Sequence, residues 1–144
     1  MTAQEIYEQF KGRIHCSQIV ACEYAEQLGY DRDEVCKIAN PFGGGMFCGD
    51  TCGAVSGAML AIGMKYGNSE HGNKEQDDLC IEKIKEFQKE FAARYNSTIC
   101  RELLGYDFRD SGQKKAAFSD GRVKEVCPCL VRDVIDILGR LLDD

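Results

Sequence analysis

The sequence has no basic tract and no long apolar run. Its 18 Lys and Arg residues are interleaved with 24 Asp and Glu residues, which gives a formal net charge of −6. Because nucleic-acid-binding domains gather Lys and Arg on one face, we expect no nucleic-acid partner. The longest mostly apolar stretch, residues 54–64, is about half the ~20 residues that span a bilayer, and the first residues lack the apolar region of a secretory signal. We therefore expect a cytoplasmic protein without membrane insertion.

Several motifs of common enzymes and cofactor proteins are also missing. No Ser/His/Asp set, paired carboxylate motif or H-E-x-x-H sequence is visible, so no residues support a hydrolase. No C-x-x-C pair occurs, which argues against a zinc knuckle and a thioredoxin-type site. The absence of C-x-x-C-H gives no support to an attached haem.

Cysteine, in contrast, is abundant. The nine cysteines are Cys16, Cys22, Cys36, Cys48, Cys52, Cys80, Cys100, Cys127 and Cys129. An odd number of cysteines without a secretory signal argues against a secreted disulfide framework and favours metal binding or redox chemistry. Because free cysteine also packs as a small apolar residue, we expect several of the nine to serve only the core.

Apolar residues recur at helical spacing along most of the chain, and no convincing strand pattern appears. The length of 144 residues and the 44% apolar content fit one domain. The sequence thus predicts a single all-α domain over residues 1–144, a compact bundle of about five to seven helices. The expected helices cover residues 3–11, 15–28, 31–40, 50–66, 73–95, 97–105 and 127–142. We expect residues 106–121 to be irregular and Pro128 to lie in the first turn of the last helix.

Four cysteines fall at or near the start of an expected helix. They are Cys16, Cys52, Cys100 and Cys127. A helix start offers free N–H donors and the positive end of the helix dipole, both of which favour a thiolate. Cys22, Cys36 and Cys80 lie among apolar residues within helices, and we interpret them as core packing. The positions of Cys48 and Cys129 allow either role.

If the four helix starts meet at one end of the bundle, the cysteines form a single sulfur-rich site. Such a site suits an iron–sulfur cluster or a tetrahedral zinc ion. It also suits metal-free thiol–disulfide exchange, with Cys52 as the activated thiol and Cys16, Cys48 or another cysteine as its partner. The spacings do not decide among these three chemistries.

The stretches CSQIVACEYAEQLG, NPFGGGMFCGDTCGAVSGAMLAIGMKYG, STICRELLGYD and CPCLVRDVIDIL together resemble the bacterial C_GCAxxG_C_C family of redox-active proteins. The central element of this family matches Cys52-Gly53-Ala54-Val55-Ser56-Gly57. The resemblance implies a small helical protein whose four family cysteines are Cys16, Cys52, Cys100 and Cys127, with Cys129 as the alternative to Cys127. Through a related module it also implies iron–sulfur binding, and hence electron transfer to a redox partner protein. Cys48 is additional to the family pattern.

Small residues and one histidine flank these cysteines. Residues Gly53, Ala54, Gly57, Ala58 and Ala61 recur at spacings of three and four, which predicts a helix face that another helix approaches closely. His15 precedes Cys16 and has two interpretations, a ligand or base for that thiol and a solvated residue at a helix start.

Overall fold

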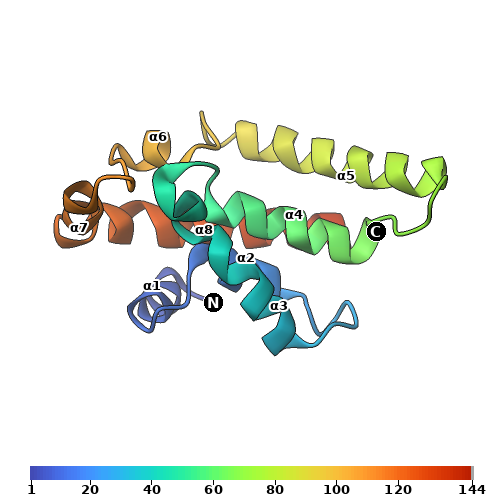
Figure 1. The fold of residues 1–144 in the computed structure, drawn as a ribbon, viewed down its shortest axis with the longest axis horizontal. Coiled ribbons are helices and arrows are strands. Elements are labelled where there is room, and N and C mark those ends of the chain that lie inside the picture. The colour runs from blue at the N-terminus through green and yellow to red at the C-terminus, as the bar shows by residue number, and fades with distance from the viewer. Residues whose placement is uncertain (144) are drawn as a thin grey trace.

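The computed structural model describes residues 1–143 and consists of helices joined by short loops (Figure 1). The helices are α1 (Ala3–Lys11), α2 (Cys16–Glu23), α3 (Arg32–Ala39), α4 (Gly53–Tyr66), α5 (Lys74–Ala92), α6 (Cys100–Leu104), α7 (Ser111–Ser119) and α8 (Arg122–Leu142). Over the described residues there is no strand, only one isolated bridge between Thr51 and Ile99. The all-α expectation is confirmed, whereas the expected five to seven helices are corrected to eight.

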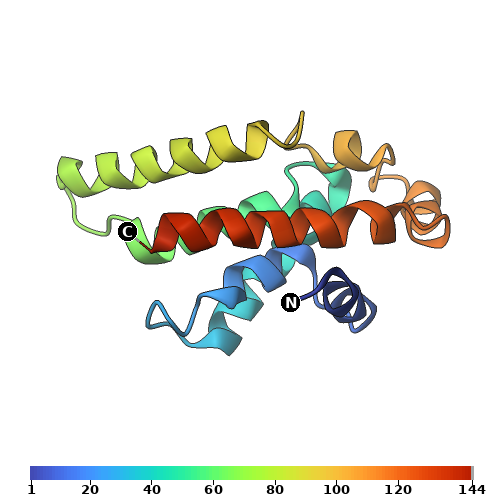
Figure 2. The ribbon, with the colours of Figure 1, turned by 180° about the vertical axis from the view of Figure 1, so that it is seen from behind.

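Helices α4 and α8 form the centre of the bundle. Helix α5 lies along one side of this pair, and α1, α2 and α3 lie along the other (Figures 1 and 2). The largest fully buried side chains come from four helices, with Phe87 and Phe91 on α5, Ile6 on α1, Ile62 on α4, and Ile137 and Leu138 on α8. Helices α6 and α7 gather at the end where α4 and α8 begin. That end of the bundle holds the candidate site.

The small residues of α4 allow α2 to pack closely against it, as the sequence predicts. A Cβ atom at Gly57 would lie 2.6 Å from the Ser17 carbonyl oxygen. The Ser17 hydroxyl also donates a 2.7 Å hydrogen bond to the Ala39 carbonyl at the end of α3. The three helices α2, α3 and α4 are therefore joined by close backbone approach and a buried hydrogen bond.

The second half of the chain departs from the expectation in two places. Residues 106–121 contain α7, because the Asp110 carboxylate accepts hydrogen bonds from the Gly112 and Gln113 amides and so caps a new helix. The last helix begins at Arg122 rather than Cys127, after Gly121 at a φ of +82°. Pro128 consequently lies inside α8 and not in its first turn.

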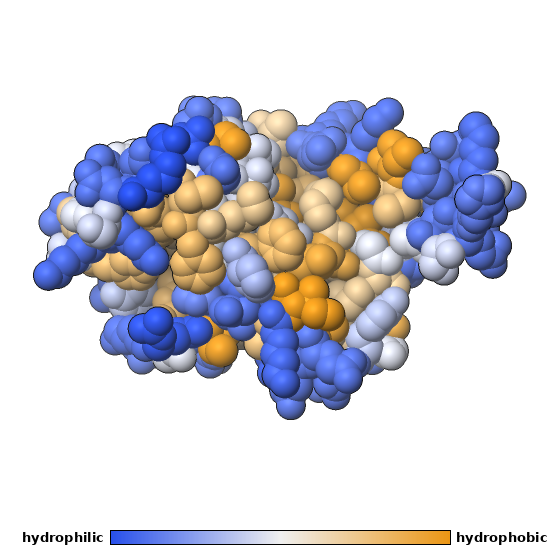
Figure 3. All heavy atoms as spheres, in the orientation of Figure 1, coloured by the Kyte–Doolittle hydropathy of each residue, from blue (hydrophilic) through white to orange (hydrophobic). Residues whose placement is uncertain are grey.

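The surface of the bundle combines apolar and polar regions. On the face shown in Figure 3, apolar residues gather over the middle, and hydrophilic residues crowd both ends. Across residues 1–143, no helix is both long enough and apolar enough to cross a bilayer.

Candidate functional site

The four cysteines of the family pattern line one cavity of about 360 Å³ at the end of the bundle. Cys16 comes from α2, Cys52 from the residue before α4, Cys100 from α6 and Cys127 from α8. Cys52 and Cys100 are buried, and the other two are partly exposed. The apolar wall of the cavity is formed by residues such as Leu103, Leu104, Phe108, Val123 and Leu130.

Local backbone structure brings Cys52 and Cys100 together, although 48 residues separate them in sequence. The Cys52 amide donates to the Thr98 carbonyl at 2.7 Å, and the Cys100 amide donates to the Asp50 carbonyl at 2.6 Å. These two bonds flank the isolated antiparallel bridge and join the segments that lead into α4 and α6. Both cysteines are thereby fixed at the starts of their helices.

Cys127 lines the same cavity from a position inside a helix. It is the sixth residue of α8, so the expectation that it lies at a helix start is wrong. The side chain instead projects into the cavity from the second turn of the helix. Cys129 is exposed and does not line the cavity. The geometry therefore favours Cys127 over Cys129 as the fourth cysteine.

Gly53 allows Cys16 to sit against the start of α4. A Cβ atom at this position would clash with Cys16 Sγ and would lie 2.8 Å from the Phe42 carbonyl oxygen. Two further glycines act similarly at the loop, because a Cβ at Gly43 would lie 2.5 Å from the His15 Cβ and one at Gly45 would lie 2.8 Å from the Cys100 Cβ. Glycine is therefore required sterically around two of the four thiols.

Backbone N–H groups point at the sulfur atoms, but burial decides the protonation state. The amides of Gly44, Ser17 and Gly53 are hydrogen-bond donors to Cys16, and those of Ala54 and Val55 are donors to Cys52. Such donors lower a thiol pKa, as the helix-start argument expects. Desolvation outweighs them, because it raises the pKa of both Cys52 and Cys100 to about 12, with the negative charge of a Cys16 thiolate adding to the shift.

Cys16 and Cys127 follow the same trend. Burial raises the pKa of each thiol, and for Cys127 the neighbouring Cys16, Cys52 and Cys100 thiolates raise it further. Without a cation to compensate them, four neighbouring thiolates are unfavourable here, so all four cysteines are neutral thiols at pH 7. The N–H donors around Cys16 and Cys52 are nevertheless arranged for a thiolate, which accepts hydrogen bonds far better than a thiol.

These shifts predict how the reduced, metal-free protein responds to alkaline pH. Above about pH 9 the unfolded chain releases the protons of Cys52 and Cys100, whereas the folded protein retains them up to about pH 12. Stability therefore falls as pH rises, and between pH 8 and pH 10 the two thiols together cost about 3 kcal/mol of unfolding free energy. Urea denaturation at the two pH values measures this loss. A Cys52→Ala, Cys100→Ala variant should lose clearly less, and an equal loss would contradict the shifts.

A left-handed turn closes one side of the cavity. Gly44, Gly45, Met46 and Phe47 all have φ values between +56° and +64°. For the two residues with side chains this conformation costs about 1–2 kcal/mol each. The turn directs the Gly44 amide toward Cys16 Sγ and places Phe47 on the cavity wall. Of the two strained residues, Phe47 lines the cavity and Met46 does not.

Apart from the cysteines, the titratable side chains at the cavity mouth are basic. Lys11, Arg13, His15 and Lys114 line it, and within the described chain no Asp or Glu does. Lys114 Nζ lies 5.0 Å from the centroid of the Phe47 ring, and His15 packs edge-to-face on the same ring at 5.0 Å. Burial, followed by the charges of Lys114 and Arg13, lowers the pKa of His15, so this imidazole is neutral at pH 7. Although the whole chain has a net charge of −6, these basic side chains make the cavity mouth favourable for negatively charged groups.

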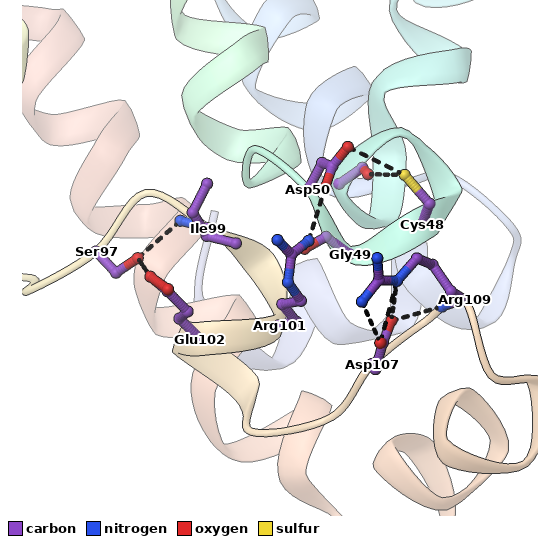
Figure 4. Close-up of polar contacts among 10 residues, drawn as sticks. Cys48, Gly49, Asp50, Ser97, Ile99, Arg101, Glu102, Asp107 and Arg109 are labelled. Atoms are coloured by element: carbon purple, nitrogen blue, oxygen red, sulfur yellow. Dashed lines mark hydrogen bonds and ion pairs between the residues drawn. The ribbon is translucent and has the colours of Figure 1, made fainter.

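Cys48 does not line this cavity, and it follows the left-handed turn directly in sequence. Figure 4 shows its polar contacts. Its thiol donates to the Asp50 carboxylate and to the Gly45 carbonyl, both at 3.4 Å. Arg101 reaches from α6 to the same carboxylate at 2.7 Å and lowers the pKa of Asp50. This group ties α6 to the turn, and Cys48 contributes to it as a hydrogen-bond donor.

A zinc ion and an iron–sulfur cluster, the two metal groups that the sequence suggests, differ in how they arrange their cysteine ligands. Among residues 1–143, no three His, Cys, Asp or Glu side chains are grouped so that they could hold a single metal ion. A tetrahedral zinc site requires its sulfur ligands within about 3.8 Å of one another, given a Zn–S bond of about 2.3 Å. An iron–sulfur cluster takes its four thiolates from a larger perimeter, with no more than two on any one iron. The four cysteines thus line one cavity without being grouped around a single point, and backbone N–H donors lie at Cys16 and Cys52.

Several residues of the site are not evident from the sequence. Gly44, Phe47 and Lys114 are examples, because their roles depend on the left-handed turn and on α7. The sequence does contain a signal for α7, since Asp110 stands where a capping residue would precede Gln113 and the helix-favouring stretch KKAA.

Comparison with known proteins adds one finding. The family model described as "Putative redox-active protein (C_GCAxxG_C_C)" matches residues 14–141. The match begins just before α2 and ends within the last turn of α8, so it includes all nine cysteines. No curated protein and no solved structure matches the chain.

Proposed function

Because the chain belongs to the C_GCAxxG_C_C family, which is described as redox-active, we propose that it binds an iron–sulfur cluster and transfers electrons to a partner protein. Cys16, Cys52, Cys100 and Cys127 would be the four ligands. The observation that carries this proposal is that four cysteines, from four separate segments, line one cavity that no Asp or Glu of residues 1–143 lines.

The electrostatics of the cavity support a metal-bound state. The four thiols, whose pKa values are raised by desolvation, lose their protons only when positive charge enters with them. A thiolate-ligated cluster supplies this charge and exchanges single electrons. The amides of Gly44 and Gly53 then donate to a charged sulfur, and the basic residues at the mouth offset the remaining negative charge.

The same electrostatics argue against the metal-free alternative. Thiol–disulfide exchange requires a thiolate, and at pH 7 a thiol with a pKa of about 12 is ionised to only about 1 part in 10⁵. Cys52 is therefore a poor nucleophile in the metal-free cavity. A structural zinc site is disfavoured because the donors of the described residues are not grouped around one ion.

The cavity mouth is the natural docking place for an electron-transfer partner. Met46, Phe47 and Phe118 are large apolar side chains that remain 40–49% exposed, and the latter two line the cavity. Lys114 and Arg13 add positive charge beside them. We expect a redox protein with an acidic surface around its own cofactor, because complementary charge accelerates association and orients the two proteins.

Anaerobic reconstitution with ferrous iron and sulfide tests the proposal, with zinc added to a parallel sample. We expect visible absorption that bleaches on reduction with dithionite and returns on reoxidation. Zinc bound in stoichiometric amount, with iron rejected, would instead indicate the structural site. A reversible disulfide that involves Cys52, with neither metal bound, would indicate the metal-free chemistry.

A further inference from the structure

The exposed part of the cavity lining differs from its buried part. The buried lining residues include Cys52 and Cys100 together with apolar side chains such as Leu130. The exposed lining residues are instead two cations and two aromatic rings, namely Lys11, Arg13, Phe47 and Phe118. The interior is thus lined by thiols and apolar groups, and the mouth by positive charge and rings.

Two cations at the mouth are not neutralised by the acidic side chains of residues 1–143. Lys11 Nζ pairs with a carboxylate of its own helix, 3.1 Å away, but neither Arg13 nor Lys114 forms an ion pair with a described Asp or Glu. Lys114 Nζ lies against two aromatic rings, 5.0 Å from the centroid of Phe47 and 5.8 Å from that of Phe108. The charges of Arg13 and Lys114 are therefore available to an anion that enters the cavity.

The backbone holds Arg13 at the mouth in a strained conformation. Its φ of +66° lies in the left-handed region, where the residue at the end of a helix is usually glycine. Here Gly12 ends α1 with a φ of −82°, and the left-handed position falls on the arginine that follows it. Strained residues with side chains cluster at functional sites, and Arg13 and Phe47 are both strained and both line this cavity.

Three aromatic rings form an apolar wall beside these cations. Phe47 belongs to the left-handed turn, Phe108 to the segment after α6 and Phe118 to α7. The centroids of the Phe108 and Phe118 rings lie 6.2 Å apart. Cavities that bind small molecules measure about 300–1,000 Å³ and combine a mainly apolar lining with a few polar groups that fix the orientation of the ligand. At about 360 Å³, this cavity has the size and the lining of such a site.

We propose that the cavity mouth is a binding site for an aromatic carboxylate. The ring of the ligand would pack against the three phenylalanine rings, on the solvent side of the buried cysteines. Its carboxylate would pair with Lys114 and with Arg13, whose planar guanidinium binds carboxylates through two parallel N–H bonds. This inference goes beyond the proposed function, since it depends on the charge and the rings of the mouth and not on the cluster. A bound carboxylate would occupy the cations that an acidic partner protein also needs, so ligand and partner would exclude each other.

Titration calorimetry with naphthalene-2-carboxylate and naphthalene-2-carboxamide tests this site, because the two probes share a ring system and differ in charge. Both are titrated into the reduced, metal-free full chain at pH 7 and low ionic strength, where charge pairing is least screened. We expect the carboxylate to bind about tenfold more tightly than the carboxamide. Equal affinities for the two probes, or no binding of the carboxylate, would overturn the proposal. Because no iron is present, the outcome does not depend on whether a cluster assembles.

Lys114→Gln and Lys115→Gln are a matched pair of variants for this assay. Lys115 is the next residue of α7, is exposed and does not line the cavity. Lys114→Gln should weaken carboxylate binding by about tenfold, whereas Lys115→Gln should bind as the wild type does. Equal affinities of the two variants would show that Lys114 does not hold the anion.

Arg13→Gly separates loss of binding from loss of structure. Glycine adopts the left-handed conformation without strain, so the melting temperature should stay at the wild-type value or rise. Carboxylate affinity should nevertheless fall by about tenfold, and carboxamide affinity should not change. A folded Arg13→Gly protein that binds the carboxylate as tightly as the wild type would contradict the role of the guanidinium.

Discussion

The Gly53→Ala variant is expected to lose iron binding while all nine cysteines remain in the chain. The added Cβ would clash with Cys16 Sγ and with the Phe42 carbonyl oxygen, 2.8 Å away. Backbone cannot move aside as a flexible side chain does, so Cys16 is displaced and α4 shifts from the turn before it. Overpacking of this kind costs roughly 1–3 kcal/mol of unfolding free energy. We expect the iron content after reconstitution to fall by at least tenfold.

Gly63→Ala is the matched control for this variant. Gly63 lies in the same helix, is exposed, and has no atom within 4 Å of an added Cβ. Alanine here should stabilise the protein by about 0.5–1 kcal/mol, because glycine loses more backbone entropy on folding. Iron content and urea denaturation measure both variants. If Gly53→Ala bound iron as well as Gly63→Ala, the close approach of Cys16 to α4 would not matter for the site.

Cys127→Ser and Cys129→Ser are expected to have opposite outcomes, although the two residues are two positions apart. Cys127 lines the cavity with the other three cysteines, whereas Cys129 is exposed and lies outside it. Serine is a poor substitute for a thiolate ligand of iron, so Cys127→Ser should lose most of the cluster. Cys129→Ser should retain it, together with the visible absorption of the reconstituted wild type.

Absorption spectra of the two variants, recorded side by side, decide between these cysteines. Circular dichroism should show equal helix content in both, since serine is nearly isosteric with cysteine. A cluster lost from Cys129→Ser and kept in Cys127→Ser would mean that α8 presents a different face to the cavity.

Helix positions follow from the sequence where a capping side chain precedes a buried apolar face. Asp31 and Asn73 accept hydrogen bonds from the Glu34 and Gln76 amides at 3.0 and 3.1 Å, at the starts of two helices that the sequence predicts. Helix α7 is missed because Ala117 is its one buried residue, so the segment has no apolar periodicity. Its position depends on contacts with α8 and with the ring of Phe108, which contacts Phe118.

The site could be predicted only in part, for a related reason. The helix starts at Cys16, Cys52 and Cys100 are local features that the sequence reveals. The approach of Cys127 to the cavity is not such a feature, because it depends on where α8 begins. Gly121 precedes that start, which lies six residues before Pro128. The raised pKa values of the thiols also cannot be predicted from the sequence. Backbone donors are a property of each helix end, whereas the burial that outweighs them arises from packing among four segments.

The central claim is that the cavity assembles a thiolate-ligated iron–sulfur cluster. The most direct test is the iron and acid-labile sulfide content per chain, measured after anaerobic purification and reconstitution of the wild type and of Cys52→Ser. We predict stoichiometric iron and sulfide in the wild type and a loss of both in the variant. Colourless, iron-free wild-type protein after anaerobic reconstitution would contradict the account.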